Sequence, residues 1–431
     1  MGVLTVLDKS TYQAYIGILK QELVPALGCT EPIAIALAAA KARDVLGEFP
    51  EKVEIQCSGN IIKNVMGVTV PNSGGMKGIG AAATLGVLGG DAKGELEVLS
   101  GITEEQRRQA RQLLDTDFFT CTLEENVDNL YIVAIVKTKK HSAQVTIVNR
   151  HTLISKIIRD GEILFEKNIL REDQKGCDKS LLNVKGIIAF AEAVDLEDIE
   201  DTIGAQIRYN TQISDEGLRG RYGVQVGRTL AERFGSDVRT RAKARAAAGS
   251  DARMGGCALP VVINSGSGNQ GLTVSLPVIE YAEQLNVGKD KLYRALVISN
   301  LIAIHQKRFI GNLSAFCGAV TAACGAGAAI TYLHGGGEEK ICDTITNTLA
   351  NVGGIVCDGA KPSCAAKIAS SVDAAIMAHE ISMRGHAFGD GEGIVQRDIE
   401  STIQSIGYVG RVGMKRTDTE ILHIMTNKVN F

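Results

Sequence analysis

The segment that decides the fold is GNLSAFCGAVTAACGAGAAITYLHGGG at residues 311–337, followed by NVGGIVCDGAKPSCAAKIASS at residues 351–371. Between Ser314 and His334 it carries no charged side chain. Small apolar residues let helix backbones approach closely, so this pattern predicts a buried helix. The two segments also contain four thiols, Cys317, Cys324, Cys357 and Cys364. The function of the chain depends on what these soft side chains bind or pack against.

The composition is that of a globular protein with nearly balanced charge. The chain has 431 residues, of which 45% are hydrophobic and 22% charged, and its net charge is -3. Near-neutral charge gives no reason to expect binding to nucleic acid or to an anionic membrane. With no Trp and 4% aromatic residues, base-stacking surfaces are not expected either. We therefore expect no nucleic-acid or membrane partner, and a homo-oligomer formed through small apolar helices.

The N-terminal sequence MGVLTVLDKSTYQAY lacks the basic segment and long apolar core of a signal peptide. Residues 315–333 are long enough to span a bilayer, but their mild hydrophobicity favours a core helix. We therefore predict a cytoplasmic protein. Its ten cysteines are then reduced, and they serve as packing groups, nucleophiles or metal ligands.

Hydrophobic periodicity predicts an α+β fold. Residues 8–47 read as helices with a break before Pro32, and residues 103–114 as an exposed helix. Residues 52–90 read as a strand, a polar loop, a second strand and a Gly-rich helix start. Residues from about 118 to 166 alternate with a period of two, which predicts an antiparallel sheet. We predict a largely helical catalytic core with small-residue buried helices from residues 1–115 and 175–431, and an antiparallel β insertion at residues 116–174.

Two short segments resemble each other. Ser58-Gly59-Asn60 is followed by VTVPN, and Ser267-Gly268-Asn269 is followed by TVSLP. Free N–H groups in a Gly/Ser loop suit a small carboxylate, so two similar loops facing one site are one interpretation. Chance similarity is the other, because the repeat is short.

The cysteines do not follow a metal-binding spacing. There is no C-x-x-C, so spacing alone does not establish an iron–sulfur site. Seven scattered histidines without a zinc motif do not make a zinc site. Cys29 is predicted at a helix N-terminus, where the helix dipole favours a thiolate. The alternative is a small buried residue at a turn.

A set of motifs carries a stronger signal than any single spacing. They are GCTEPIAIALAAA, CSGNIIKNVMGVTVPNSG, ARMGG, NSGSGNQG, IGNLSAFCGAVTAACGAG and NVGGIVCDGAKPSCAAKIA. Together they resemble the L-cysteine desulfidase family over nearly the whole chain. More distantly, FCGAVTAACGAGAAI, GGIVCDG and NSGSGNQGLTVSLP are similar to the alpha part of the iron–sulfur L-serine dehydratases.

The resemblance implies an oxygen-sensitive 4Fe-4S cluster held by Cys29, Cys317 and Cys357, which aerobic purification can remove. Cys364 is a weaker ligand candidate, because its distance from Cys357 is shorter than in the serine dehydratases. Cys324 ranks below it as a core thiol. Three ligands on four irons leave one iron open as a Lewis acid, and a soft thiolate leaving group suits iron.

The activity that the resemblance implies is pyridoxal-phosphate-independent β-elimination of L-cysteine to sulfide, ammonia and pyruvate. This makes the chain a carbon–sulfur lyase of cysteine catabolism with a small amino-acid substrate. The candidate general bases are Lys63, His305 and Lys307, each of which can equally have a structural role. The residues expected to bind the substrate carboxylate and amino group are Ser58, Asn60, Asn64, Asn72, Ser265, Ser267 and Asn269.

Three alternatives remain. An iron–sulfur L-serine dehydratase-like lyase would use the same cluster, with water as the leaving group. A pyridoxal-phosphate lyase would need a Schiff-base lysine, for which Lys243 is the candidate, although the chain has no convincing phosphate-binding loop. A non-catalytic thiol or metal sensor belongs to another class, and the two substrate-like loops and the absence of a DNA-binding element argue against it.

Overall fold

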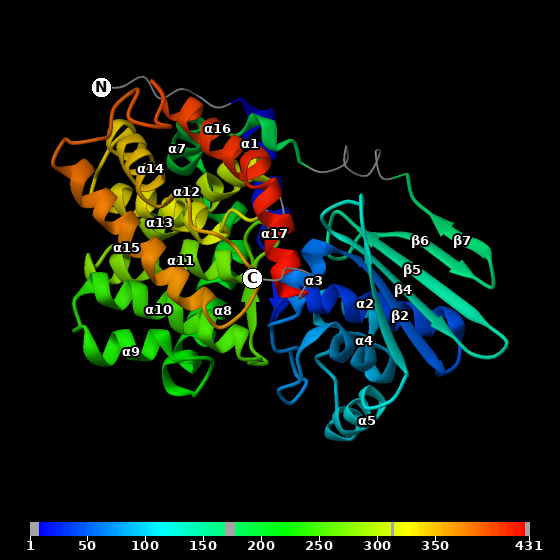
Figure 1. Cartoon of the computed structure of the whole chain (residues 1–431). Helices are drawn as coiled ribbons and strands as arrows, with labels where there is room; N and C mark the ends of the chain where they lie inside the picture. Colours follow the sequence, from blue (N-terminus) through cyan, green and yellow to red (C-terminus); the bar gives the residue numbers. More distant parts are fainter. Residues whose placement is uncertain (1–7, 169–176, 312–313, 427–431) are drawn as a thin grey trace.

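The chain folds into a helical lobe and an α+β lobe that lie side by side (Figure 1). The computed structural model describes residues 8–168, 177–311 and 314–426. The α+β lobe is built mainly from the N-terminal third of the chain, and the helical lobe from most of the rest. None of the helices in these ranges combines the length and the apolar character needed to cross a membrane. The predicted α+β fold class is confirmed.

The helical lobe is organised around α13 (Gly318–Leu333), which contacts α11 (Gly268–Gln284), α12 (Lys289–Ile310), α14 (Glu338–Val352) and α15 (Cys364–Met383). Its glycines let these neighbours come close. A Cβ atom on Gly325 would lie 2.3 Å from the carbonyl oxygen of Ser299 in α12. The uncharged segment is therefore a central buried helix, as its sequence predicts.

The other elements of this lobe surround the central helices. The helices are α1 (Lys9–Glu22), α7 (Val184–Ala193), α8 (Glu200–Arg219), α9 (Val226–Arg233), α10 (Val238–Met254), α16 (Ile399–Tyr408) and α17 (Lys415–Met425). Short turns of helix lie at Lys179–Leu181, Leu196–Asp198 and Val409–Gly413. Helix α17 lies beside the α+β lobe and contacts its helix α3 (Figure 1).

The α+β lobe contains a six-stranded sheet in the order β3-β2-β4-β5-β6-β7. The strands are β2 (Lys52–Ser58), β3 (Phe119–Glu124), β4 (Tyr131–Lys137), β5 (Ser142–Val148), β6 (Ile154–Arg159) and β7 (Glu162–Glu166). Strand β2 runs parallel to β3, and all other neighbours are antiparallel. The sheet is therefore mixed, with one parallel pair at its edge.

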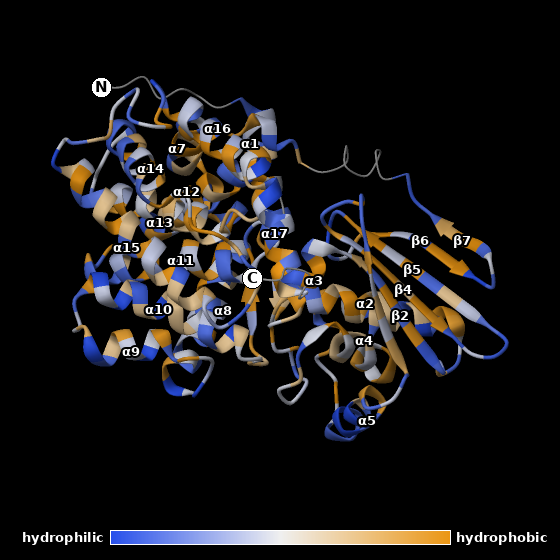
Figure 2. Ribbon diagram, in the orientation of Figure 1, coloured by the Kyte–Doolittle hydropathy of each residue, from blue (hydrophilic) through white to orange (hydrophobic). Residues whose placement is uncertain are grey.

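Helices cover the apolar residues of this sheet. They are α2 (Thr30–Leu46), α3 (Gly59–Val65), α4 (Gly78–Gly89) and α5 (Glu104–Leu114), with a 3-10 segment at Ala92–Glu97. Apolar residues concentrate on α2, α4 and the inner strands, which together form a second hydrophobic core (Figure 2). Ala36 and Gly86 are in close contact, since a Cβ atom on Gly86 would lie 2.4 Å from the Ala36 carbonyl oxygen.

A two-stranded sheet joins the beginnings of two helices that are distant in sequence. Strand β1 (Pro25–Leu27) pairs antiparallel with β8 (Pro260–Val262). Because β1 leads into α2 and β8 leads into α11, this pairing brings the N-terminal ends of α2 and α11 together. The same pairing connects the two lobes.

The predictions for residues 52–90 are partly wrong. Residues 59–65 form helix α3 instead of a polar loop, because the Ser58 side chain caps the helix by accepting from the Ile61 amide. The second strand does not form, and Thr69 makes only an isolated bridge with Lys77. Strand β2 lies between β3 and β4, so the sheet extends beyond residues 116–174. The catalytic-core and insertion boundaries stay a prediction.

Candidate functional site

A cavity of about 1370 Å³ lies where the two lobes meet. Helix starts and loops form much of its wall. From the α+β lobe, its polar lining residues include Cys29, Glu31, Asn64 and His151. From the helical lobe, they include Arg253, Gln270, Lys307, Cys317, Cys357 and Cys364. The cavity therefore collects thiols and charged groups from segments far apart in the chain.

Cys317 and Cys357 are held next to each other by the backbone. Cys317 is the residue before α13, and Phe316 forms an antiparallel bridge with Val356. The Cys317 thiol donates a hydrogen bond to the Cys357 sulfur, and this bond lowers the pKa of Cys357. Positive charge from Lys63 and Lys307 acts in the same direction. One thiolate of the pair is therefore favoured, while the pKa of Cys317 is raised.

Cys29 enters the same cavity from the start of α2. It is 1% exposed and packs with Val68 and Met254, and Cys364 packs against this group. Burial and the negative charge of Glu31 raise the pKa of Cys29 well above its usual value. The Cys29 thiol donates to the Glu31 carboxylate at 3.1 Å. Burial therefore outweighs the helix dipole in its effect on the pKa of Cys29, which agrees with the alternative interpretation of Cys29 as a small buried residue at a turn.

Cys364 and Cys324 occupy different environments. Cys364 is the first residue of α15, lines the cavity and donates to the Gly359 carbonyl at 3.6 Å. Burial raises its pKa. Cys324 lies inside the helical core at 0% exposure, where its thiol donates to the Ile345 carbonyl at 3.8 Å. The structure therefore places Cys29, Cys317, Cys357 and Cys364 at the cavity, which Cys177 also lines, and it places Cys324 away from the cavity.

The donor set of the cavity is chemically suited to an iron–sulfur cluster. In the described ranges, no three His, Cys, Asp or Glu side chains form a site for a single metal ion. The cavity instead offers five thiols, the four named above and Cys177, and thiolates are the ligands that iron–sulfur clusters use. Lys307, buried at the same cavity, adds positive charge near the thiolates. These residues therefore fit a thiolate-bound cluster.

A polar wall faces the thiols. Its centre is the tight turn from Asn264 to Ser267, in which the Asn264 and Ser267 backbones bond each other at 3.1 and 3.0 Å. Ser265 and Gly266 both have positive φ, as such a turn requires. The Thr30 hydroxyl donates to the Gly266 carbonyl at 3.0 Å. The turn is thus fixed against the start of α2.

Comparison with known proteins identifies the family. Residues 93–423 match the family described as serine dehydratase alpha chain. A UPF0597 protein of Lachnoclostridium phytofermentans is 56% identical over 416 residues, covering 96% of this chain and 100% of that relative. A UPF0597 protein of Desulfitobacterium hafniense is 52% identical, covering 97% of each chain.

The chain belongs to the serine dehydratase alpha chain family. The predicted similarity to the alpha part of the iron–sulfur serine dehydratases is therefore confirmed. Similarity also extends to a UPF0597 protein of Aeromonas salmonicida, 41% identical over 428 residues. Membership of the serine dehydratase alpha chain family supports a lyase-like iron–sulfur enzyme.

The predicted substrate-binding residues divide into two groups in this family member. Four of them line the cavity, namely Asn64, Ser265, Ser267 and Asn269. Ser58 and Asn60 do not line it and contact the backbone and side chain of Asn129. Ser58 also caps α3, so its polar side chain has a local structural role.

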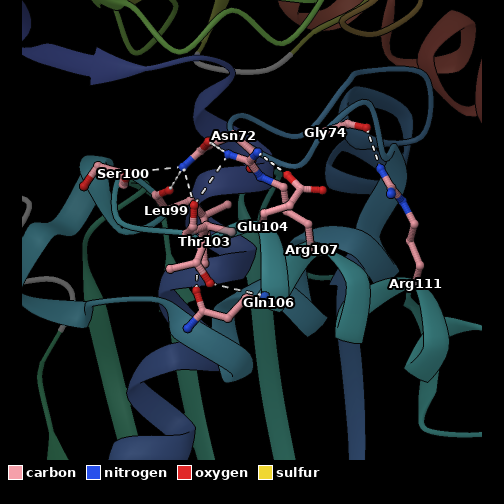
Figure 3. A network of polar contacts seen from close by, with 10 residues as sticks. Asn72, Gly74, Leu99, Ser100, Thr103, Glu104, Gln106, Arg107 and Arg111 are labelled. Atoms are coloured by element: carbon pink, nitrogen blue, oxygen red, sulfur yellow. Dashed lines mark hydrogen bonds and ion pairs between the residues drawn. The ribbon is translucent and has the colours of Figure 1, made fainter.

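Asn72 has a structural role away from the cavity lining (Figure 3). Its side-chain amide donates to the carbonyl oxygens of Leu99 and Ser100 at 3.0 and 3.1 Å. The Arg107 side chain donates to the Asn72 carbonyl at 2.8 Å. These contacts tie the loop after α3 to the start of α5, and they occupy the groups that were predicted to bind substrate.

The three candidate bases lie in different places. Lys307 lines the cavity, and burial lowers its pKa while the Cys357 and Cys317 charges act in the opposite direction. His305 is 0% exposed and its Nε2 lies 2.7 Å from the Glu400 carboxylate, outside the cavity lining. Lys63 forms an ion pair with Asp418 of α17. Of these candidates, Lys307 faces the space that the thiols share.

Lys243, the candidate Schiff-base lysine, also lies outside the cavity lining. Its ammonium group is 2.8 Å from the Asp373 carboxylate, between α10 and α15. The ion pair with Asp373 therefore gives Lys243 a structural role.

Sequence reasoning missed several polar groups of the cavity, among them His151, Arg253 and Gln270. His151 lies between β5 and β6, and its Nε2 is buried with no hydrogen-bond partner among the described residues. Burial lowers the pKa of His151. Arg253 and Gln270 also line the cavity. A signal for two of them was available, since Arg253 lies in ARMGG and Gln270 in NSGSGNQG, both motifs that carry the family resemblance.

Proposed function

We propose that this chain is a pyridoxal-phosphate-independent L-cysteine desulfidase. It eliminates sulfide from the β carbon of L-cysteine, and the aminoacrylate that remains tautomerises and is hydrolysed to pyruvate and ammonia. The observation that carries the proposal is the meeting of Cys29, Cys317, Cys357 and Cys364 at one cavity that also has a polar wall. The proposal goes beyond the family relationship, which supports a lyase-like enzyme without naming this substrate.

Cys29, Cys317 and Cys357 would hold a 4Fe-4S cluster, with Cys364 as an additional thiol of the same cavity. When bound, the cluster supplies an open iron that acts as a Lewis acid toward a soft leaving group. Cys29 and Cys317 are buried, whereas Cys357 and Cys364 are half-buried. The helix starts at Cys29, Cys317 and Cys364 add dipoles that favour thiolate charge.

Lys307 is the group we assign to removal of the α proton. It lines the cavity, and the described part of the chain offers its ammonium group no carboxylate within ion-pair distance. The charges of Cys357 and Cys317 act on the pKa of Lys307, which supports a position close to these two thiols. Burial favours the neutral amine of Lys307, which accepts the α proton. The electron pair of the carbon–hydrogen bond forms the Cα–Cβ double bond of the aminoacrylate, and the electron pair of the carbon–sulfur bond leaves with sulfur.

The second candidate function is elimination of water from L-serine, which the match to the serine dehydratase alpha chain family favours. The same base and polar wall would serve both substrates, because only the β substituent differs. A thiolate is the softer ligand for iron, which is the physical reason for preferring L-cysteine.

The deciding experiment is anaerobic reconstitution with iron and sulfide, followed by assays with L-cysteine and L-serine. Sulfide, ammonia and pyruvate in equal amounts from L-cysteine, at a higher kcat/KM than pyruvate from L-serine, supports the proposal. Equal or faster turnover of L-serine replaces it with the serine dehydratase function. Protein with an intact cluster and no turnover of either substrate overturns both, and it favours a thiol or metal sensor. The matched control variant is Cys324→Ala, which removes a thiol that does not line the cavity.

A further inference from the structure

We infer that Arg253 binds the α-carboxylate of the substrate, with Gln270 and Asn269 accepting from its ammonium group. This inference rests on the proposed function, because it assigns the part of the cavity that would recognise an α-amino acid. It adds Arg253 and Gln270 to the substrate-binding residues expected from the sequence, which already include Asn269.

Arg253 is a buried cation at the C-terminal end of α10. Its side chain is 2% exposed and is among the largest fully buried side chains of the protein. The guanidinium Nε donates to the Gly28 carbonyl at 2.9 Å. An arginine has five N–H donors, so this bond leaves most of the guanidinium available to another acceptor.

The charge of Arg253 has no counter-ion within the described ranges. No Asp or Glu of those ranges lies in ion-pair contact with it, and Glu31 instead accepts from Cys29 and Thr30 at 3.1 Å. A buried charge without a partner is costly, and a buried arginine is therefore normally matched by an anion. Arg253 lines the cavity, so an anion within the cavity can supply the missing partner.

Two glycines let the guanidinium reach the site. A Cβ atom on Gly268, the first residue of α11, would lie 2.3 Å from Nε and 2.9 Å from Cζ of Arg253. Gly28, whose carbonyl accepts from Arg253, directly precedes Cys29 at the start of α2. The guanidinium therefore sits where the N-terminal ends of two helices converge, and both dipoles add positive potential for a carboxylate.

The acceptors for an ammonium group lie in the first turn of α11. Gln270 is 6% exposed, and its Oε1 has no hydrogen-bond partner among the described residues. The buried Oδ1 of Asn269 is likewise without one in those ranges. Both residues line the cavity. Unsatisfied buried amide oxygens are unusual in proteins, and an ammonium group supplies the donors that they lack.

Gly318 fixes Gln270 against the thiol side of the cavity. A Cβ atom on Gly318 would lie 2.6 Å from Cδ of Gln270, so a larger residue at position 318 would displace this carboxamide from its present position. Gly318 directly follows Cys317. A substrate held by Arg253 and Gln270 at its α carbon would thus have its β carbon available to the thiol-lined side of the cavity.

The test measures binding of unreactive amino-acid analogues, so it does not depend on turnover. L-Alanine carries the carboxylate and ammonium groups without a leaving group, and L-alaninamide lacks the carboxylate. Ligand-observed NMR titration under anaerobic conditions would compare them on wild type, Arg253→Gln and Arg253→Lys. The control is Arg239→Gln, which lies on the same helix but pairs with Asp373 and does not line the cavity.

Wild type is expected to bind L-alanine at least about tenfold more tightly than L-alaninamide, and Arg253→Gln to lose that difference. Arg253→Lys should be intermediate, because lysine keeps the charge but loses the two-pronged contact. Equal affinity for the two analogues in wild type, or an unchanged difference in folded Arg253→Gln, would overturn the inference. If Arg253→Gln does not fold, the inference is tested by the relative affinities of wild type and Arg253→Lys for L-alanine and L-alaninamide.

The outcome is separate from that of the proposed function. Arg253-dependent binding of L-alanine in a protein that forms no sulfide would keep this site and reject the desulfidase. Sulfide formation with an unchanged KM for L-cysteine in Arg253→Gln would keep the desulfidase and reject this site.

Discussion

Two backbone hydrogen bonds join the segments that carry Cys317 and Cys357: the Cys317 amide donates to the Ile355 carbonyl at 3.0 Å, and the Cys357 amide donates to the Ala315 carbonyl at 2.6 Å. These two backbone hydrogen bonds hold the segments that carry the two cysteines next to each other. Because these bonds involve only backbone atoms, substitution of the Cys317 or Cys357 side chain should alter metal binding without unfolding the site.

Cys317→Ser and Cys357→Ser should each lose the cluster. Hydroxyl oxygen is a poorer ligand for iron than thiolate, so iron content after anaerobic reconstitution should fall and kcat/KM for L-cysteine should drop by roughly 100-fold, about 2.7 kcal/mol. Iron and acid-labile sulfide analysis, with the visible absorption of the cluster, checks this. Cys342→Ala, a cysteine that does not line the cavity, serves as the control. Full iron content in Cys357→Ser would contradict the ligand assignment.

Substitution of Cys364 tests whether this thiol is a cluster ligand or only a packing group. We expect Cys364→Ala to keep the iron content of the wild type, because Cys29, Cys317 and Cys357 are sufficient for three coordination positions. Its thermal stability should fall slightly, since the thiol packs beside Cys29, Val68 and Met254. Iron analysis and thermal unfolding measure the two effects. Loss of the cluster in this variant would raise Cys364 to a required ligand.

Removal of the amine of Lys307 should stop proton transfer while leaving the cluster in place. Lys307→Met keeps an apolar chain of similar length in a buried position. Exchange of the L-cysteine α proton with solvent deuterium should disappear, and kcat should fall by about 100-fold or more. His305→Gln is the matched control on the same helix, since His305 contacts Glu400 outside the cavity lining. Normal α-proton exchange in Lys307→Met would transfer the base role to another group, with His151 next to be tested.

Asp251 gives a prediction about stability and pH. Burial raises the pKa of this carboxyl to about 6, and its Oδ1 has no partner among the described residues. Its folded pKa is above its unfolded value, so ionisation of Asp251 progressively destabilises the protein as the pH rises from about 4 to about 6, and the loss is constant above that range. Asp251→Asn should therefore gain stability relative to wild type between pH 4 and pH 8, on the order of 1 kcal/mol. Urea unfolding at several pH values tests this, and a pH-independent difference would contradict it.

Local sequence patterns predicted the parts of the site that lie on single elements. The uncharged run in residues 314–334 is a buried helix, because glycine and alanine allow the close contacts of Gly325 with α12. Cys29 is at a helix start because Thr30 and Pro32 allow α2 to begin there. These features depend on residues close in the sequence and on helical periodicity, and both can be read from a sequence pattern.

The repeated Ser-Gly-Asn segments show where local patterns mislead. Ser58 and Ser267 are both helix N-caps that accept from amides three residues ahead, Ile61 and Gln270. The repeat therefore reflects a shared capping structure. The β1–β8 pairing determines which of the two reaches the cavity, and only the Ser267 segment lies beside it.

The missed residues come from contacts over long sequence distances. Arg253 bonds to Gly28, which is 225 residues away. His151 reaches the cavity from a loop of the sheet, where its Cε1 lies close to Gly266 of the other lobe. Such contacts depend on how the two lobes pack, and neither composition nor periodicity contains that information.

The ion pair between Lys63 and Asp418 links the C-terminal helix to the thiol site. Lys63 has a side-chain exposure of 2%, and its partner lies on α17. The backbone carbonyl of Lys63 touches Gly359, where a Cβ atom would lie only 2.1 Å from it. Gly359 follows Cys357 by two residues, so α17 supports the turn that carries this thiol through α3.

Asp418→Asn would leave the buried ammonium group of Lys63 without its carboxylate. Loss of one partner of a buried ion pair costs about 3 kcal/mol, so the variant should unfold at a lower urea concentration. It should also retain iron less well than wild type after reconstitution. The double variant Lys63→Met with Asp418→Leu removes both charges and should recover much of the stability, because the unpaired charge causes the loss. Additive losses in the double variant would show that the two side chains do not act as a pair, and Glu420→Gln, an exposed change on the same helix, is the control.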